Sequence, residues 1–296
     1  MTGHNSFKVA IGEIAQNFER FKSNLQITSL QQETTSARQK TVREVVEAKF
    51  NVLDTFLTGS YVRQTMIAPL KDADIDIFTV LSPDYYKQDG QLALLNALMA
   101  ALKVSYPTTP RISPNGQAVT IIFTDFRADV VPAFNRQGGG YIIADSKNGK
   151  WISTNPKSHI TYKTEQNSWH NGNLVPLIKM IKCWNRHSGS PFSSFYLELL
   201  ISKILTGITI SNYPSGVRYF FDKAREQIKY TIPDPAGLGS NVSGFNPGTN
   251  VVSAVALIQK SYDTAIEAER LTSLGFNLKA AEKWQGLFGD YFPIYV

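Results

Sequence analysis

The fold is decided by two neighbouring stretches, Gly59-Ser60-Tyr61-Val62-Arg63-Gln64-Thr65 and Asp72-Ala73-Asp74-Ile75-Asp76-Ile77-Phe78. In a β-strand, side chains two residues apart point to the same face. Asp74 and Asp76 therefore project together, while the isoleucines that alternate with them face a core. Strands disfavour Asp, and two like charges on one face repel each other. We expect a cation to hold them, and Mg²⁺ is the natural one because this hard ion takes oxygen ligands.

A third carboxylate, Asp129, strengthens this prediction. Residues 119–123 and 127–131 both have the composition of strands, and Pro132 is expected to end the second. Asp129 has apolar neighbours in that strand, so we expect it within the sheet. Two metal ions about 4 Å apart and held by carboxylates suit in-line displacement at phosphorus. The sequence therefore predicts that Asp74, Asp76 and Asp129 are catalytic and bind two Mg²⁺ ions, with Mn²⁺ as a substitute.

The turn at Gly59 and Ser60 is expected to present backbone N–H groups to a triphosphate, as phosphate-binding turns do. Glycine has no Cβ to block this close approach. Each feature alone has an ordinary explanation: a common turn, an exposed strand edge, or a buried ion pair at Asp129. Their combination in this order, with the carboxylates among apolar strand residues, indicates a nucleotidyl-transfer site.

The composition restricts the class of protein. The chain has 296 residues, of which 43% are hydrophobic, as is typical of a globular protein with sizeable cores. Its net charge of +6 is compatible with polyanionic ligands, although the sequence contains no dense run of Lys or Arg. The single cysteine, Cys183, excludes an internal disulfide and favours a reducing, cytoplasmic location. The sequence shows neither a signal-peptide pattern nor an apolar run long enough to cross a membrane.

The pattern along the chain predicts an α+β protein with two lobes. Residues 1–160 are expected to form the catalytic lobe, a mixed sheet with supporting helices within residues 5–50. Residues 161–296 are expected to form a helical lobe that closes the nucleotide cleft, and the polar segment 151–164 marks the boundary. Helices are predicted at residues 7–23, 30–50, 91–104, 168–187, 193–207, 217–230, 250–273 and 278–288, and further strands at 55–58, 75–81 and 141–144.

The two opening stretches, together with Asp129-Val130-Val131-Pro132-Ala133, resemble the DNA polymerase β-like nucleotidyltransferases. Three later stretches narrow the resemblance: Leu177–Trp184 with its two lysines, Ser193–Glu198, and Asp234-Pro235 with Asn241-Val242. With them the chain resembles the bacterial cyclic-oligonucleotide synthases (CD-NTases). These are relatives of cyclic GMP-AMP synthase and of the 2′-5′ oligoadenylate synthases, and they act in anti-phage (CBASS) signalling. The resemblance covers most of the chain, from about residue 55 to residue 242.

The resemblance implies a two-lobed polymerase β-like fold and a Mg²⁺-dependent synthase that makes a cyclic di- or trinucleotide and releases pyrophosphate. Its substrates would be ATP, GTP, UTP or CTP, and a regulatory or effector protein encoded alongside is an implied partner. Activation by nucleic acid is not indicated. The implied nucleotide-binding residues are Gly59, Ser60, Arg63, Thr65, Lys179, Lys182, Ser193 and Ser194. The family often has Gly where Gln64 stands, which leaves the geometry of this turn open.

Two other classes of protein remain possible at this point. A template-free RNA-tailing enzyme, of the CCA-adding or poly(A) polymerase kind, shares the Gly-Ser turn and the carboxylates. Such enzymes usually carry additional RNA-binding regions, and the sequence shows no basic tail that could serve as one. A non-catalytic nucleotide sensor of the same fold is the second alternative, although the presence of all three carboxylates argues against it.

Overall fold

A computed structural model describes residues 3–70, 74–109 and 111–294. Two residues of the opening motif, Asp72 and Ala73, lie outside this description. The chain divides into two compact units. The first, called here the sheet unit, comprises Ile27–Thr164 and Asp234–Ser240, and the second, the helical unit, comprises Met1–Gln26, Glu165–Pro233 and Asn241–Val296. Together they confirm the predicted α+β class.

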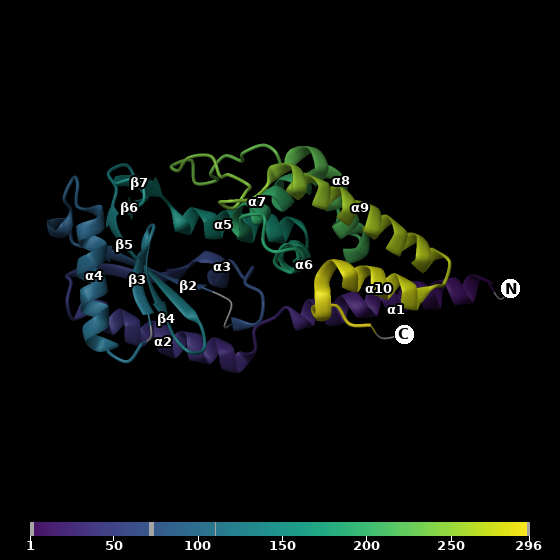
Figure 1. Cartoon of the computed structure of the whole chain (residues 1–296), viewed down its shortest axis with the longest axis horizontal. Helices are drawn as coiled ribbons and strands as arrows, with labels where there is room; N and C mark the ends of the chain where they lie inside the picture. Colours follow the sequence, from purple (N-terminus) through teal and green to yellow (C-terminus); the bar gives the residue numbers. More distant parts are fainter. Residues whose placement is uncertain (1–2, 71–73, 110, 295–296) are drawn as a thin grey trace. The chain divides into compact units, whose positions relative to one another are not determined.

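Within the described residues, seven strands of the sheet unit form one mixed sheet (Figure 1). Its main path runs in the order β1-β2-β5-β4-β3, and β6 pairs with both β5 and β7. Strands β2 and β5 are parallel, whereas the other pairs are antiparallel. The strands are β1 (Val52–Thr58), β2 (Asp74–Leu81), β3 (Arg111–Asn115), β4 (Ala118–Ile122), β5 (Arg127–Asn135), β6 (Tyr141–Asp145) and β7 (Lys150–Thr154).

Helices α2 (Ser29–Glu47) and α4 (Gln91–Ser105) cover one face of this sheet (Figure 1). Ile75 and Ile77 are buried on this face beside Val130, as the alternation predicts. The opposite face has a smaller apolar cluster, which includes Phe78 and Tyr141. Because strand residues alternate between faces, Asp74 and Asp76 lie on the same side as this smaller cluster, away from α2 and α4.

Strand β5 runs through Pro132 to Asn135, so the prediction that Pro132 ends the strand is wrong. On one side β5 pairs with β4 up to Val130, and it pairs with β6 only from Ala133 onward. Pro132 falls in the gap between these two partners, where the missing N–H group costs no ladder hydrogen bond.

The segment 151–164, predicted as a polar boundary, forms most of β7 and the start of helix α5 (Pro156–Trp169), and the long stretch of the sheet unit ends at its last residue, Thr164. The ring of Trp151 packs on Tyr86 and Phe134, which ties β7 to the rest of the unit. Proline is well suited to the first position of a helix, and Pro156 occupies it. The polarity of this segment therefore reflects an edge strand and a helix that is only partly buried.

The helical unit contains α1 (Gly3–Asn24) together with α6 (Leu174–His187), α7 (Ser194–Ile204), α8 (Tyr213–Gln227), α9 (Val251–Ser273) and α10 (Asn277–Phe288). The helix predicted from residue 168 begins instead at Leu174. Two residues just before it, Asn171 (φ 51°) and Gly172 (φ 81°), are left-handed and interrupt the helical backbone. Among the helices of the described ranges, none has the length and apolar character needed to cross a membrane.

The sheet unit ends at Thr164, near the predicted division at residue 160, but α1 belongs to the helical unit because it packs with the C-terminal helices. Phe18 and Phe21 of α1 are fully buried. The Phe18 ring lies 5.1 Å from the rings of Trp284 and Phe292, measured between centroids, and Phe21 lies 4.6 Å from Phe288. Of the two N-terminal helices, α2 therefore supports the sheet and α1 belongs to the helical unit.

Candidate active site

The strand register places polar side chains in a row across four strands of the sheet unit. Asp76 on β2 pairs with Asp129 on β5, and these are flanked by Thr58 on β1 and Thr120 on β4. Paired residues on neighbouring strands share a face of the sheet. Asp74 lies two residues before Asp76 and hence on the same face. The structure thus brings the three predicted carboxylates together on the face that α2 and α4 leave uncovered.

Asp129 is held by Thr120, a residue that sequence reasoning missed. The Thr120 hydroxyl donates a hydrogen bond of 2.5 Å to Oδ1 of Asp129, and the threonine side chain is nearly buried. This bond occupies one carboxylate oxygen from the β4 side and orients the group. No local motif marks Thr120, since only the β4–β5 register makes it the neighbour of Asp129.

Asp74 faces Arg127, its partner in the parallel β2–β5 ladder. The Arg127 Nε lies 2.6 Å from Oδ1 of Asp74, and both side chains are a little over 40% exposed. Burial and the negative charge of Asp129 raise the pKa of Asp74, and the guanidinium offsets only part of this effect. The site is therefore a region of concentrated negative charge.

The predicted Gly-Ser turn lies directly against this row. Gly59 begins the short helix α3 (Gly59–Val62) with φ +70°, and a Cβ at this position would fall 1.7 Å from Oδ2 of Asp76. Any side chain at position 59 would displace that carboxylate. The carbonyl of Ser60 accepts hydrogen bonds from the amides of Thr65 and Met66, which closes the turn.

The structure shows the backbone geometry of the turn at Gln64, which the sequence left open. This residue is left-handed with φ 59°, a conformation that glycine adopts more readily. The turn is therefore kept despite the side chain, at a conformational cost. Thr65 is fully buried, with its hydroxyl 3.5 Å from the Ser60 carbonyl, whereas Arg63 is half-buried. Their predicted contacts with nucleotide remain predictions.

The donor set suits a hard divalent cation, because the three side chains offer only carboxylate oxygens. Such an ion would relieve the repulsion between the negative charges of Asp74 and Asp129. In the part of the chain that the structure describes, three or more acidic, His or Cys side chains are nowhere gathered into a ready-made metal site. Protein partners, Arg127 and Thr120, hold two of the carboxylates instead.

The two predicted lysines lie on α6 in the helical unit, and both are almost completely buried. The Nζ of Lys182 lies 3.2 Å from Oε1 of Glu198 on α7, so these two buried side chains form an ion pair. Lys179 donates a 2.6 Å hydrogen bond to Oε1 of Gln26. Burial and the charge of Lys182 lower the pKa of Lys179 to about 8.

The predicted serines stand at the N-terminus of α7. Ser193 is the residue just before the helix and is half-buried, and Ser194 is its first residue and is exposed. The predicted site residues thus form two groups. The carboxylates and the turn belong to the sheet unit, and the lysines and serines belong to the helical unit.

The Asp234-Pro235 element braces a loop of the sheet unit. Asp234 lies 2.6 Å from Nε2 of His159 on α5, and it accepts hydrogen bonds from the amides of Ala236 and Gly239. Although burial acts in the opposite direction, these bonds hold the pKa of Asp234 below its usual value. In this structure the element therefore has a bracing role.

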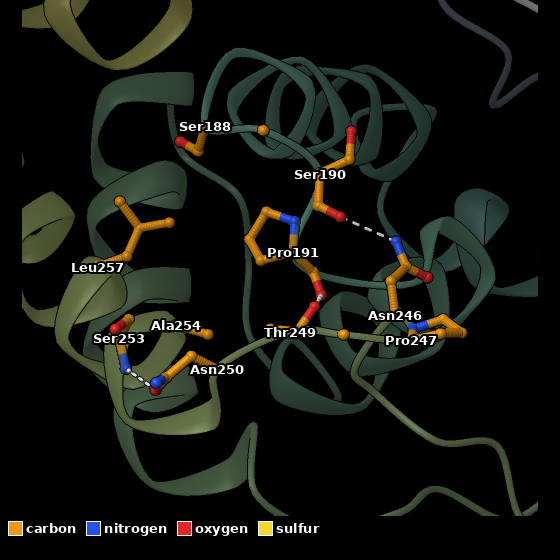
Figure 2. Close-up of a pocket in the computed structure, with 12 residues that line it drawn as sticks. Ser188, Ser190, Pro191, Asn246, Pro247, Thr249, Asn250, Ser253, Ala254 and Leu257 are labelled. Carbon is orange, nitrogen blue, oxygen red and sulfur yellow. Dashed lines mark hydrogen bonds between the residues drawn. The ribbon is translucent and has the colours of Figure 1, made fainter.

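A pocket of about 400 Å³ in the helical unit lies where α6 ends and α9 begins (Figure 2). Its polar groups bond to one another: Asn246 donates to the Ser190 carbonyl, Thr249 to the Pro191 carbonyl, and the amide of Ser253 to Asn250. The twelve lining residues, all in the described range 188–257, include none of the predicted site residues. The candidate site is therefore the carboxylate row.

Comparison with known proteins gives the family of this chain. A family model described as Second Messenger Oligonucleotide or Dinucleotide Synthetase domain matches residues 13–167, a little over half of the chain. A cyclic AMP-AMP-AMP synthase of Acinetobacter sp. is 29% identical over 254 residues, which are 81% of this chain and 72% of that protein.

Two solved structures share the fold. The E. coli CdnC:HORMA-deltaN complex gives a TM-score of 0.70 at 20% identity, covering 94% of this chain and 98% of that chain. The CD-NTase CdnG of Bradyrhizobium diazoefficiens in complex with GTP gives 0.73 at 14% identity, covering 93% and 95%. The chain therefore belongs to the second messenger oligonucleotide or dinucleotide synthetase family, the CD-NTase group of nucleotidyltransferases.

Proposed function

We propose that this protein joins nucleoside triphosphates into a cyclic di- or trinucleotide and releases pyrophosphate at each step. The observation that carries the proposal is the row formed by Asp76 and Asp129, with Asp74 beside it and the Gly59 turn against it. Membership of the synthetase family supports cyclisation as the outcome.

In this proposal Asp74, Asp76 and Asp129 hold two Mg²⁺ ions. When bound, such ions acidify an attacking hydroxyl and offset charge on the leaving group. The backbone N–H groups of the Gly59-Ser60 turn position the triphosphate of the donor nucleotide. A ribose hydroxyl then forms a bond to the α-phosphorus as the bond to the bridging oxygen breaks, and pyrophosphate leaves.

Lys179 and Lys182 of the helical unit are proposed as phosphate contacts on the resemblance to the family. Lysine acts as a compact point charge for phosphate, so each would offset negative charge of the triphosphate. Because Lys182 also pairs with Glu198, its net contribution is smaller than that of Lys179. Arg63, Thr65, Ser193 and Ser194 are proposed as nucleotide contacts on the resemblance to the family alone.

We further propose ATP as the first substrate to test, because the Acinetobacter relative is named a cyclic AMP-AMP-AMP synthase. The E. coli neighbour was solved with a HORMA protein, which supports a regulatory protein partner for this chain as well. A role in anti-phage (CBASS) signalling follows as part of the same proposal.

The test is mass spectrometry of the products formed by the full chain from the four triphosphates with Mg²⁺. We expect a phosphatase-resistant cyclic product and release of pyrophosphate. Asp76→Asn should abolish both while leaving the melting temperature nearly unchanged. Asp54→Asn is the matched control because Asp54 lies on β1 of the same sheet, four residues from Thr58, and pairs with Lys157 at the surface.

Other outcomes would contradict the proposal in different ways. Elongation of added tRNA, without a small product, would indicate an RNA-tailing enzyme. Nucleotide binding without release of pyrophosphate, including in the presence of a partner protein, would indicate a sensor. Full turnover by Asp76→Asn would show that the carboxylate row is not catalytic.

A further inference from the structure

Arg127 is placed by the register of the sheet, and its guanidinium lies within the proposed metal site. It pairs directly with Asp74 across the parallel β2–β5 ladder, one row away from the Asp76–Asp129 pair. Its Nε lies 2.6 Å from Oδ1 of Asp74, an oxygen that the proposed function assigns to a metal ion. The same oxygen cannot be fully available to both cations.

The ion pair has the properties of an exchangeable contact. Both side chains are more than 40% exposed, and such ion pairs contribute little to stability because solvent screens them. The pair Lys182–Glu198 is different, since its side chains are only 7% and 1% exposed and its loss would leave a charge buried. Arg127–Asp74 is therefore not needed to hold the two strands together.

The charges around Asp74 favour a cation beside it. Asp129 pairs with Asp76 in the β2–β5 ladder, one row from Asp74 and on the same face of the sheet. Without any cation the carboxylates of Asp74, Asp76 and Asp129 would repel one another on a partly desolvated surface. A guanidinium offers one positive charge and directional donors, and a divalent cation offers more charge to the same oxygens.

We propose that Arg127 competes with a divalent cation for Asp74: its guanidinium neutralises this carboxylate and must release Oδ1 when the cation binds. This inference rests on the proposed function, which assigns Asp74 to the metal. It gives Arg127 a role that the carboxylate motif does not contain, which is to compete with the metal for an oxygen of Asp74.

The first test measures binding of Mn²⁺ to the full chain without nucleotide, by the loss of the free-ion signal in electron paramagnetic resonance. We expect R127Q to bind Mn²⁺ at least about fivefold more tightly than the unmodified protein. R111Q is the matched control. Arg111 is exposed and lies two strands from Arg127 in the same row of the sheet: Arg111 pairs with Ile122, and Ile122 pairs with Arg127. The R111Q variant therefore removes an equal charge away from Asp74. R111Q should stay within about twofold of the unmodified protein.

The second test follows the Nε–H signals of the arginines by ¹⁵N nuclear magnetic resonance during a titration with diamagnetic Mg²⁺. R127K identifies the Arg127 signal by its disappearance, and this measurement on the unmodified protein does not depend on R127Q folding. We expect the Arg127 signal to shift and to exchange faster with water as Mg²⁺ binds, while the Arg111 signal stays in place.

Equal Mn²⁺ affinities of R127Q and R111Q, or an Arg127 signal that Mg²⁺ does not change, would overturn the inference. Failure of Mn²⁺ to bind to both the unmodified protein and R127Q would overturn it as well. The product assay with the four triphosphates decides the proposed function separately. If the protein forms the cyclic product but the Arg127 signal shows no exchange, the proposed function stands and the inference about Arg127 is wrong.

Discussion

At the scale of single residues, the turn after β1 depends on two backbone conformations. Gly59 is left-handed where a Cβ would collide with Asp76, and Gln64 is left-handed although it has a side chain. The sequence predicted the need for glycine at position 59, although the group that approaches most closely is a carboxylate of the protein itself. It could not show that Gln64 would accept the strained conformation.

We predict that Gln64→Gly raises the free energy of unfolding by about 1 kcal/mol, because glycine adopts a positive φ without the steric cost that other residues incur. Chemical denaturation measures the change. Gln64→Ala is the control, since alanine keeps the steric cost and should give no increase. An equal gain from both variants would show that the side chain, and not the backbone, is the source of the strain.

Thr120 gives the second prediction at this scale. Thr120→Val keeps the shape of the side chain and removes the hydroxyl that orients Asp129. Groups that orient metal ligands typically contribute about 10–100-fold to metal affinity or activity, so we expect a loss of roughly tenfold in Mn²⁺ affinity.

Thr120→Ser retains the hydroxyl and should restore most of that affinity. If Thr120 only fills space, the valine variant will keep its metal affinity and the serine variant will be the less stable of the two. The comparison of binding with thermal stability therefore separates orientation of Asp129 from simple packing.

At the scale of elements, α6 carries two lysines that have opposite effects on the free energy of unfolding. Lys182 is compensated by Glu198, whereas Lys179 is buried with a polar but uncharged partner, Gln26. The spacing of i and i+3 predicted that the two lysines share a face. It could not predict which would be compensated, because Glu198 and Gln26 come from other helices or their ends.

We predict that Lys179→Met raises the free energy of unfolding at pH 7 by about 2–3 kcal/mol, because burial of the ammonium lowers the pKa of Lys179 from 10.5 to about 8. Between pH 8 and 10.5 the unfolded chain binds more protons than the folded chain. The stability of the unmodified protein should therefore increase with pH in this window. The Lys179→Met variant should lack this increase, and denaturation at several pH values measures both effects.

Lys182→Met provides the contrast for this prediction. It leaves Glu198 charged and buried without its partner, which typically destabilises a protein by about 3–5 kcal/mol. The two substitutions should thus have opposite signs at pH 7. A destabilised Lys179→Met variant would indicate that Lys179 is charged and well compensated in the folded protein.

At the scale of the whole molecule, the first helix and the C-terminal residues 284–292 pack together in the helical unit. The rings of Phe18 and Phe21 from α1 pack with those of Trp284, Phe288 and Phe292. Near them, the side-chain amide of Asn24 donates a hydrogen bond of 2.9 Å to the carbonyl of Tyr291. The first helix is thus part of the core that the last helix completes.

We predict that Phe18→Ala destabilises the helical unit by about 3–5 kcal/mol, the usual cost of removing a buried aromatic ring. Thermal unfolding followed by tryptophan fluorescence measures it, since Trp284 lies in the same cluster. Leu30→Ala is the control because Leu30 is 70% exposed at the start of α2, and it should change stability by less than about 0.5 kcal/mol. Equal effects of the two variants would show that α1 is not part of this core.

By itself the sequence determined the alternating strand with Asp74 and Asp76 on one face, the glycine turn before it, and the α+β class. These features depend on period and on local conformation, which neighbouring residues along the chain specify. Only the tertiary structure decided that Thr120 and Arg127 hold the carboxylates, that Pro132 lies within a strand, and that α1 joins the C-terminal helices. The physical reason is that register and packing join residues far apart in sequence, and many pairings satisfy the same local pattern of apolar and polar residues.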